Sequence, residues 1–486
     1  ESIQLAGSFS GAATGGIWST TGSGSFMPNN MDLNATYVLG ASDRTADSIK
    51  IYLTSSNDPI GLCPPGVDSM TVIIDSAAIV NVGPDQFICN TDDIITLDAT
   101  LSGTAIAGVW VSNAAFGNYL MPDTDLSTTF QLNALGMSQD SILFSFMTND
   151  PSGVCEAGND TLTVYIQQVG IGKLYVDSSA TGANNGSSWA DAFTSLQDAL
   201  MICGVDTICV AQGTYYPDQG EGVMDDDRTA SFVIGDSVVI FGGFPSGGGP
   251  DSLRDWLCNK TILSGDINQD GDTTGNSYHV VETMHVSDGT EVDGFCITGG
   301  NANHPFISNY RHGAGWYNDG SSSGEGSNPK ISNVNFSGNY SSISGTFYNN
   351  ALAGKATTVF SNVIFSGNEV GLNGAAIYNF ALSQGEINLT FTNGLVTGNY
   401  AGSNAGAIYN DGEDGVVTTL IINTTFSGNK AEGNGSIIFS DADDSGVSTT
   451  TIVNSIVYGN ESGDNKIISE NFGSTSNIAY SILQCC

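Results

Sequence analysis

The chain has 486 residues, of which 50 are acidic and 11 are basic, so its formal net charge is −39. A field of that sign repels nucleic acid, anionic membranes and acidic polysaccharides, and it attracts cations such as calcium. Only 13% of the residues are charged, which excludes a disordered polyelectrolyte, and no apolar run is long enough to predict a membrane span. The 62 glycines, with many Val, Ile, Phe and Tyr residues, indicate an all-β protein of short strands and turns.

Residues 1–75 and 80–167 repeat each other at an offset of about 92 positions. The segment Gly16-Ile17-Trp18 matches Gly108-Val109-Trp110, and Met27-Pro28 matches Met121-Pro122. Short alternating strands with frequent turn residues and one Trp per unit predict two β-sandwich domains, over residues 1–76 and 77–169. We expect Trp18 and Trp110 to be core residues.

The cysteines of the two units differ. We expect Cys89 and Cys155 to form a disulfide, which would stabilise the second unit by roughly 4 kcal/mol on the loop-entropy model. The counterpart of Cys89 in the first unit would precede Ser2, so we expect Cys63 to be unpaired, the first strand to be missing and the parent protein to be longer. These units resemble the immunoglobulin-like (Ig-like) repeats of large bacterial surface proteins exported by the type IX route. That resemblance implies an extracellular, cell-surface location.

From about residue 300, the sequence repeats with a period of roughly 30 residues. Phe336-Ser337-Gly338-Asn339 recurs from Phe365 and from Phe426, and a second phrase ending in Tyr-Asn recurs between these copies. Three short strands per period predict a parallel β-solenoid over residues 170–486, with equivalent residues about 4.8 Å apart in stacked coils. We expect two inward-facing series: a Phe series of Phe336, Phe365 and Phe426, and an amide ladder of Asn333, Asn362, Asn393, Asn423 and Asn454.

The start of the solenoid is less regular. Residues Trp189 to Met201 have an amphipathic pattern that predicts a capping helix over the open end of the column. Cys203 and Cys209 flank a short turn and are expected to form a disulfide, and Cys258 with Cys296 is a further predicted pair.

The coil phrases resemble the FxxN and GGAI repeats of polymorphic outer-membrane proteins, which are autotransported adhesins. Phe336 with Asn339 fits the first pattern, and Gly374 to Ile377 approximates the second. The opening from Tyr175 to Trp189 resembles bacterial surface proteins of the pectate-lyase-like superfamily. These resemblances imply a right-handed parallel β-helix, a fold that hosts both enzymes and adhesins.

Candidate catalytic groups are sparse. The cations beyond residue 300 do not share one position in the coils. The best candidate region for a general base contains His304, Arg311 and His312, and the alternative interpretation of this region is a solvated loop. The cations beyond residue 300 are Arg311, Lys330, Lys355, Lys430 and Lys466. Acidic residues recur after the Tyr-Asn phrase, where they would form a solvated edge or bridge calcium. They are Asp319, Glu325, Glu413, Asp414, Asp441, Asp443 and Asp444.

One segment has a calcium-binding pattern. Asp266, Asn268, Asp270 and Asp272 match the first half of an EF-hand loop, but the expected Glu at the twelfth position is Ser277. The pattern predicts a Ca²⁺ site at this segment, and the alternative is a β-solenoid loop without a bound ion.

Asp-Ser/Thr-apolar tripeptides resemble the O-glycosylation signal of bacteria that use type IX export. The alternative is a turn in which the Asp caps the backbone at a strand start. The hydroxyl residues are Ser48, Ser69, Ser76, Ser141, Thr161, Thr207, Ser237 and Ser252.

We expect a non-catalytic structural or adhesive module of a larger bacterial surface protein. Its expected partners are other copies of itself, other cell-surface components or carbohydrate, with no nucleic acid and no membrane insertion. The alternatives are a carbohydrate-active enzyme, either a polysaccharide lyase or a glycoside hydrolase, and a glycan-binding module without catalysis. Three convergent carboxylates in a groove would favour the enzyme.

Overall fold

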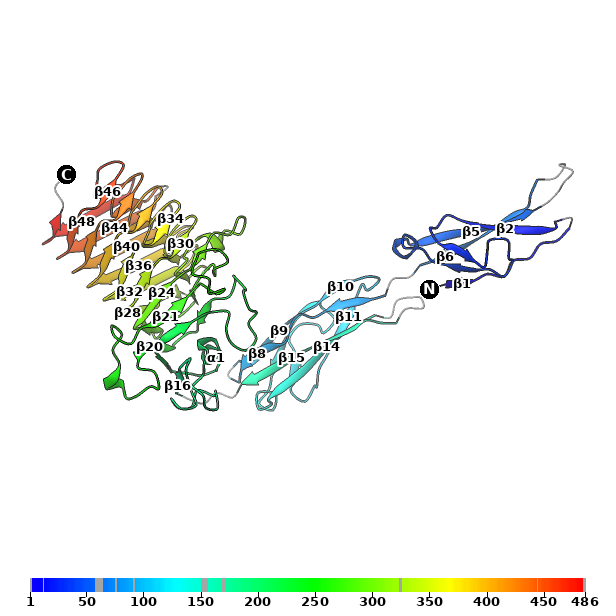
Figure 1. The fold of residues 1–486 in the computed structure, drawn as a ribbon, viewed down its shortest axis with the longest axis horizontal. Helices are drawn as coiled ribbons and strands as arrows, with labels where there is room; N and C mark the ends of the chain where they lie inside the picture. The colour runs from blue at the N-terminus through cyan, green and yellow to red at the C-terminus, as the bar shows by residue number, and fades with distance from the viewer. Residues whose placement is uncertain are drawn as a thin grey trace. The chain divides into compact units, whose positions relative to one another are not determined.

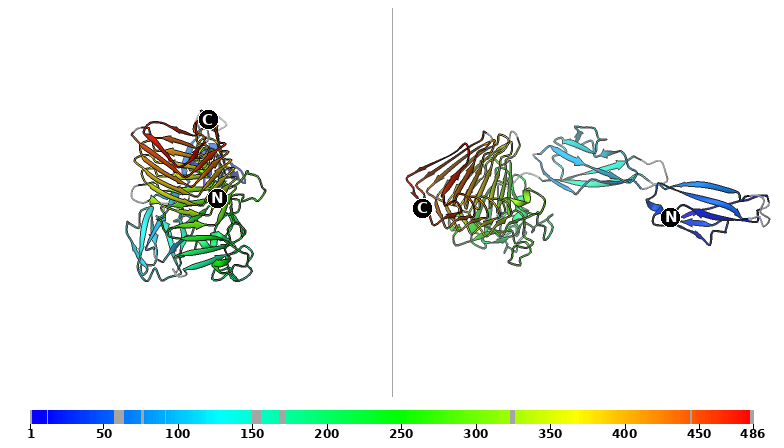
Figure 2. Two further views of the ribbon diagram at one scale, coloured as in Figure 1. Left: turned by 90° about the vertical axis from the view of Figure 1, so that its left-hand side faces the viewer. Right: turned by 90° about the horizontal axis from the view of Figure 1, so that it is seen from above.

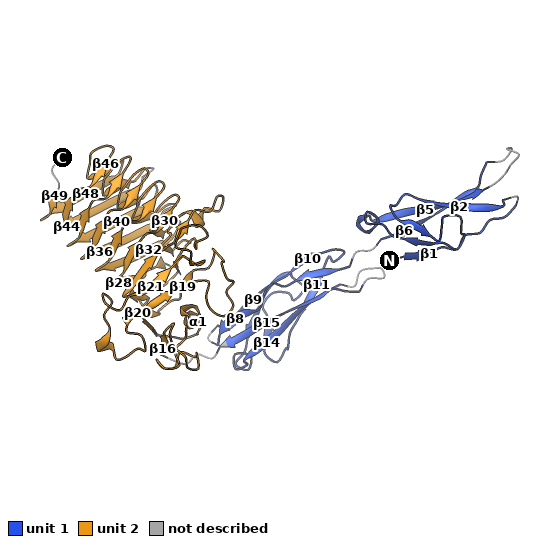
Figure 3. Ribbon diagram, viewed as in Figure 1, with its two compact units in different colours: residues 1–168 blue, residues 169–486 orange. Residues whose placement is uncertain are grey.

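The structure is a computed structural model. It describes residues 2–11, 13–56, 64–74, 77–90, 92–149, 156–167, 172–322, 326–443 and 445–483. The chain is all-β and divides into two compact units, Glu1–Gln168 and Val169–Cys486 (Figure 3). The boundary lies one residue before the predicted one.

Unit 1 holds two sets of small sheets, each around its own hydrophobic cluster. The first set has the sheets β1-β4-β3 and β2-β5-β6, formed by β1 (Ser2–Gln4), β2 (Gly15–Thr20), β3 (Ser25–Met27), β4 (Thr36–Val38), β5 (Ser48–Ser56) and β6 (Val67–Ile73). The second set has the sheets β12-β13-β9, β11-β14-β15-β8 and β10-β7, formed by β7 (Ile79–Asn81), β8 (Gln86–Cys89), β9 (Ile94–Asp98), β10 (Thr100–Ser102), β11 (Gly108–Val111), β12 (Gly117–Tyr119), β13 (Ser127–Leu132), β14 (Ser141–Thr148) and β15 (Asn159–Gln167).

The internal duplication is visible in the hydrogen bonds. Trp18 pairs with Leu53 across β2 and β5, and its indole Nε1 donates to the carbonyl of Asp32 at 3.0 Å. Trp110 pairs with Phe146 across β11 and β14, and its Nε1 donates to the carbonyl of Asp125 at 3.1 Å. Both indoles are buried, as expected. Strand β8 pairs in parallel with β15, whereas β6 pairs with β5 alone among the described strands.

Unit 2 is a parallel β-solenoid of four sheets, whose successive strands come from successive coils (Figures 1 and 2). The first solenoid sheet contains β16 (Lys173–Val176), β17 (Thr207–Ala211), β20 (Val239–Phe244), β23 (Glu291–Asp293), β28 (Lys330–Ser332), β32 (Lys355–Ser361), β36 (Glu386–Thr392), β40 (Val416–Ile422), β44 (Val447–Val453) and β48 (Ser474–Ala479), with β27 (Gly326–Ser327) beside β32. The second contains β18 (Gly213–Tyr215), β21 (Thr261–Ser264), β24 (Phe295–Thr298), β29 (Asn335–Ser337), β33 (Ile364–Ser366), β37 (Leu395–Thr397), β41 (Thr425–Ser427), β45 (Ile456–Tyr458) and β49 (Ile482–Leu483).

The other two solenoid sheets complete each coil. The third contains β25 (Asn301–Ala302), β30 (Tyr340–Ser341), β34 (Glu369–Val370), β38 (Tyr400–Ala401), β42 (Lys430–Ala431) and β46 (Glu461–Ser462). The fourth contains β19 (Phe232–Ile234), β22 (Val281–Met284), β26 (Trp316–Asp319), β31 (Phe347–Asn350), β35 (Ile377–Phe380), β39 (Ile408–Asp411), β43 (Ile438–Asp441) and β47 (Ile468–Glu470). Every pairing within these sheets is parallel, so each coil buries its apolar face against its neighbours.

The column core follows the sequence repeat. Phe336, Phe365 and Phe426 are fully buried, and the rings of Phe336 and Phe365 stack with centroids 4.6 Å apart. These phenylalanines point inward in register, as the repeat predicts, with Val396 between Phe365 and Phe426.

The predicted Asn ladder is wrong in its direction. Asn333 and its equivalents lie in turns between the first and second solenoid sheets with positive φ, and four of the five are exposed. A left-handed turn directs their side chains outward, where Asn362 Nδ2 donates to Asn333 Oδ1 at 2.6 Å.

Two other Asn series form the buried ladders. In the first, each Nδ2 donates to the Oδ1 of the next coil at 2.9–3.1 Å, through Asn339, Asn368, Asn399, Asn429 and Asn460. In the second, the same bond measures 2.8 Å at each step through Asn318, Asn349, Asn379 and Asn410. These side chains are at most 4% exposed, so the amides satisfy one another inside the column.

The predicted capping helix is also wrong. The α-helix α1 spans only Leu196–Leu200, where the Ser195 hydroxyl accepts a hydrogen bond from the Gln197 amide. Trp189 instead packs against Tyr175 and Phe244, and its Nε1 donates to the carbonyl of Gly249. Three 3-10 helices, η1 (Asp43–Thr45), η2 (Asp251–Leu253) and η3 (Asn309–Arg311), complete the helical content of the described residues.

Candidate functional site

The outer surface of the first solenoid sheet has a long uncharged area. Strands β40, β44 and β48 contain no ionisable residue, and their sequences are rich in Thr, Val and Ile. Register places Thr418 beside Thr449 and Leu420 beside Thr451. On β36, the Glu386 carboxylate forms an ion pair with Lys355 at 2.8 Å. We name the outward residues of β40, β44 and β48, together with those of β36 beyond Glu386, the Thr/Val face.

The fourth solenoid sheet carries an aromatic stack on its outer side. Adjacent ring centroids lie 4.8–5.5 Å apart through Tyr317, Tyr348, Tyr378, Tyr409 and Phe439. Each ring is at most 9% exposed, so the stack is part of a packed cluster rather than an open platform for sugars.

The acidic edge lies beside this stack. The Tyr378 hydroxyl donates to Asp411 Oδ2 at 2.6 Å, and the Tyr409 hydroxyl donates to Asp441 Oδ2 at 3.3 Å. Burial raises the pKa of Asp411 to about 6, and the charges of Asp441 and Glu413 add to the shift. The Asp319 carboxylate accepts a hydrogen bond from the Asn350 amide instead.

The remaining acidic residues of this edge lie in the loops that follow. Asp414 accepts a hydrogen bond from the Ser383 amide, and Glu413 and Asp443 line a shallow hollow with Phe472. Glu325 and Asp444 lie outside the described residues. The described carboxylates of this edge include no group of three close enough to share one metal ion.

The predicted general-base region is built as a packed loop. His312 Nδ1 lies 2.7 Å from the Ser344 hydroxyl, and burial lowers the pKa of His312 to about 4. His304 Nδ1 accepts the backbone amides of Phe306 and Ile307, and Arg311 Nε donates to the Ser342 hydroxyl. The structure therefore gives each of these groups a local hydrogen-bonding role.

Three of the predicted cations of the coils are paired with carboxylates at the surface. Lys355 contacts Glu386, Lys430 contacts Glu432 at 2.6 Å, and Lys330 lies 3.7 Å from Asp288. The backbone amide of Lys466 donates to Ser462 and Asp464. Such exposed pairs contribute little to stability.

The predicted calcium segment folds as a loop of short turns. Asn268 Nδ2 donates to Asp270 Oδ2, Asp270 Oδ1 accepts the Asp272 amide, and Asp266 Oδ2 accepts the Gly271 amide. The structure does not gather these carboxylates into a group of three. Within the described ranges, the trio with close carboxylate oxygens is Asp218, Asp225 and Asp226, which the EF-hand pattern does not predict. The signal in the sequence is the run Asp225-Asp226-Asp227.

The cysteine predictions require correction. Cys89 and Cys203 are disulfide-bonded, whereas Cys209, Cys258 and Cys296 are free thiols. The predicted Cys203–Cys209 and Cys258–Cys296 pairs are therefore wrong. The sequence predicts that Cys209 flanks a short turn, but Cys209 lies within strand β17 and is fully buried. Its side chain therefore takes the direction that the strand imposes.

The remaining pairing stays a prediction. Cys63 and Cys155 lie outside the described residues, so neither the unpaired state of Cys63 nor the Cys89–Cys155 bond is tested. Register places Cys89 beside Gln167, at the end of β15.

Most of the candidate glycosylation sites are accessible. Ser48 and Ser141 begin the equivalent strands β5 and β14, and both are exposed. Ser69, Thr161, Ser237 and Ser252 are also exposed, Thr207 is half-buried, and Ser76 lies outside the described residues. Modification of these hydroxyls stays a prediction.

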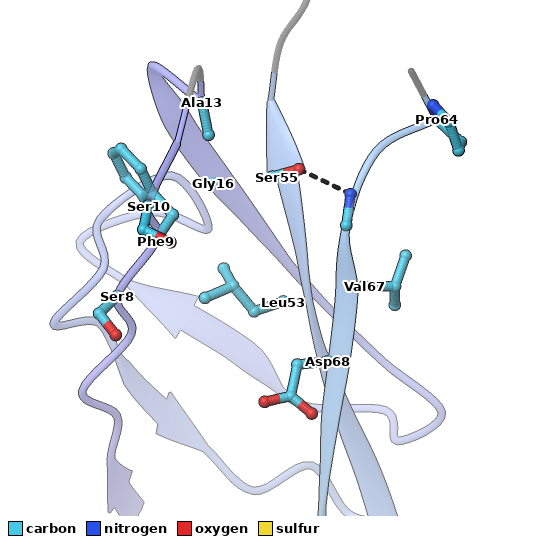
Figure 4. A pocket seen from close by; sticks show the side chains of 11 residues that line it. Ser8, Phe9, Ser10, Ala13, Gly16, Leu53, Ser55, Pro64, Val67 and Asp68 are labelled. Atoms are coloured by element: carbon cyan, nitrogen blue, oxygen red, sulfur yellow. Dashed lines mark hydrogen bonds between the residues drawn. The ribbon is translucent and has the colours of Figure 1, made fainter.

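A hollow of about 490 Å³ lies in unit 1 between strands β5 and β6 and a wall that includes Ser8, Phe9, Ser10 and Ala13 (Figure 4). Its wall includes Leu53, Val67 and the carboxylate of Asp68, and the Ser55 hydroxyl accepts a hydrogen bond from the Gly66 amide. A single carboxylate among apolar and hydroxyl side chains supplies no pair of groups for acid–base chemistry.

No helix among the described residues is long and apolar enough to cross a membrane. No protein-family model matches the chain, and no curated protein matches it. Among solved structures, it is similar to mouse cadherin-23 EC22-24, at 10% sequence identity and a TM-score of 0.21. That match covers 36% of this chain and 63% of the cadherin structure, so the chain spans less than two thirds of it.

Proposed function

We propose that this chain is a non-catalytic structural or adhesive module of a larger bacterial surface protein, and that it associates with like copies through the Thr/Val face. In this proposal, unit 1 supplies Ig-like spacers and unit 2 is a right-handed β-helix that presents the contact surface. The protein is extracellular, and its export follows the type IX route.

The observation that carries the proposal is the absence of charge from β40, β44 and β48 in a chain of net charge −39. Copies with that charge repel each other, so contact is least unfavourable where no carboxylate has to be buried. A flat face of Thr, Val and Leu side chains can meet the same face of a second copy about a two-fold axis.

The dimensions of the Thr/Val face predict weak association. Four strands spaced about 4.8 Å apart, each about seven residues long, cover on the order of 400 Å² per copy. Stable interfaces bury roughly 800 Å² per partner, so one such contact is too small for a permanent dimer. Association would gain strength where many copies are held on one surface.

The buried ladders support a structural role. The Asn residues of the repeated phrases are hydrogen-bonded to each other inside the column. The need to satisfy these buried amides is sufficient to account for the recurrence of Asn in the sequence. The predicted catalytic loop at Arg311 and His312 is likewise held by hydrogen bonds to Ser342 and Ser344.

Sedimentation velocity tests the proposal. The intact chain should show weak, reversible self-association that strengthens with salt, because salt screens the net repulsion. Leu420→Lys introduces a charge in the centre of the Thr/Val face and should abolish association. Leu395→Lys makes the same change on a half-exposed leucine of the second solenoid sheet and should leave association intact.

A chain that stays monomeric at all concentrations would refute self-association, as would equal effects of the two variants. Degradation of a polysaccharide by the intact chain, lost on Arg311→Ala or on Asp218→Asn, whose carboxylate lies in a trio with those of Asp225 and Asp226, would instead support the carbohydrate-active enzyme.

A further inference from the structure

Three carboxylates converge in the loop that joins β18 to β19. Asp218, Asp225 and Asp226 each place an oxygen within 4.8 Å of an oxygen of the other two. Asp218 is buried and the other two are exposed, so the trio has an inner wall and an open side. Among the described residues, no Lys, Arg or His side chain forms an ion pair with this trio.

An independent observation points to a ligand at this trio. Asp218 is only 4% exposed, and its Oδ1 has no hydrogen-bond partner, while its Oδ2 accepts the Asp226 amide at 3.1 Å. A buried carboxylate oxygen without a partner is costly, and a bound cation would remove that cost. Asp266 Oδ1 and Asp441 Oδ1 are also buried without a partner, but neither belongs to a group of three close carboxylates. Burial raises the pKa of Asp218, and the charges of Asp225 and Asp226 raise it further against the lowering effect of the amide hydrogen bond.

The nearest basic residue in the sequence is engaged elsewhere. Arg228 Nε donates to the carbonyl of Asn276 at 2.7 Å, and its Nη2 donates to the carbonyl of Asn301 at 3.1 Å. Its guanidinium also lies over the Tyr278 ring, 4.2 Å from the centroid. Arg228 therefore does not supply a positive charge to the trio.

Both ends of the loop are fixed to the solenoid. Gln197 Nε2 donates to the carbonyls of Pro217 and Ser231, at 2.5 and 2.8 Å, and Arg228 ties the loop to the next coils. A ligand bound by Asp218, Asp225 and Asp226 would hold the intervening segment closed between these two anchors.

We propose that Asp218, Asp225 and Asp226 form a calcium site that closes the loop between β18 and β19. An all-oxygen set of carboxylates suits a hard cation, and the exposed side leaves room for the water molecules that complete the six to eight ligands of Ca²⁺. Affinity in the range of extracellular modules, with a Kd of about 10⁻⁴–10⁻³ M, is expected for three protein ligands.

The test compares the intact chain with Asp218→Asn and with Asp270→Asn, a matched change in the loop that the sequence pattern had favoured. In 150 mM NaCl, calorimetric titration with CaCl₂ should show one site more in the parent chain and in Asp270→Asn than in Asp218→Asn. Ca²⁺ at ten times its Kd should slow proteolytic cleavage between residues 219 and 227 about tenfold in the parent chain and in Asp270→Asn, but not in Asp218→Asn.

A second measurement separates a metal ligand from a purely structural carboxylate. In EDTA, Asp218→Asn should melt at the same temperature as the parent chain or higher, because it removes a buried unpaired charge, and in Ca²⁺ it should melt lower. Asp218→Asn melting lower by the same amount in EDTA and in Ca²⁺ would overturn the proposal. Loss of the extra site in Asp270→Asn would assign calcium to the Asp266 loop and would also overturn it.

Discussion

The buried amide ladder can be tested by replacing its middle member, Asn399, with Leu. Asn399 Oδ1 accepts both the backbone amide and the Nδ2 of Asn368, at 3.0 and 2.9 Å. Its own Nδ2 donates to Asn429 Oδ1 and to the carbonyl of Phe365, each at 2.9 Å. The substitution keeps the volume of the side chain and removes all four bonds.

The expected loss of stability follows from the groups left behind. The substitution leaves the Asn368 amide, one Nδ2 hydrogen of Asn368 and the Phe365 carbonyl buried without these partners. Each unsatisfied group costs about 1–3 kcal/mol, and some relaxation is expected, so the free energy of unfolding should fall by about 3–6 kcal/mol. The matched control is Asn393→Gly in the outer Asn series, where φ is +55° and glycine fits.

Urea unfolding followed by circular dichroism measures both effects. Asn399→Leu should unfold at a clearly lower urea concentration than the parent chain, and Asn393→Gly should change the free energy of unfolding by less than about 1 kcal/mol. Equal midpoints for the two variants would show that the inner amides do not stabilise the column, and the reasoning would fail.

Four further predictions can be tested on the same protein. Phe365→Ala should lower the free energy of unfolding by about 3–5 kcal/mol, since it opens a cavity in the column, and the same urea assay measures it. In the folded protein, the exposed Cys258 should react with a thiol reagent while the buried Cys209 should react only after unfolding; equal rates would contradict the burial. Burial raises the pKa of Asp411 above its unfolded value, to about 6, so the folded state favours its protonated form. Stability should therefore fall as pH rises from about 4 to 6, by at most about 3 kcal/mol from this group, and Asp411→Asn should flatten that dependence. Intact mass spectrometry of protein from its native source should show added sugar mass, and a bare polypeptide mass would end the glycosylation hypothesis.

The sequence predicted the features that depend on period and alternation. The stacking of Phe336 on Phe365, and the equivalent positions of Trp18 and Trp110 in the two halves of unit 1, follow from repeats that place equivalent residues in equivalent environments. Period alone does not give the direction of a side chain at a turn. Asn333 and Asn339 recur equally well, but positive φ turns Asn333 outward, whereas Asn339 is buried.

The other differences arise from contacts distant in sequence. The amphipathic pattern from Trp189 predicts a longer helix, but packing of that indole on Tyr175 and Phe244 leaves only Leu196–Leu200 helical. The trio of Asp218, Asp225 and Asp226 cannot be predicted from the sequence because its members span a loop with no metal-binding spacing, and only folding brings their oxygens together.

The coil arrangement also determines how unit 2 would respond to mechanical tension. Each coil is hydrogen-bonded only to the coils before and after it, so a pull on the chain would detach the outermost coil first. A released coil of about 30 residues would lengthen the chain by roughly 100 Å, at about 3.3–3.6 Å per residue. The coils that follow Lys330 would then release chain in steps of similar length, which single-molecule force spectroscopy would record as a regular series of force peaks, whereas the longer and unequal coils before Lys330 would give irregular steps.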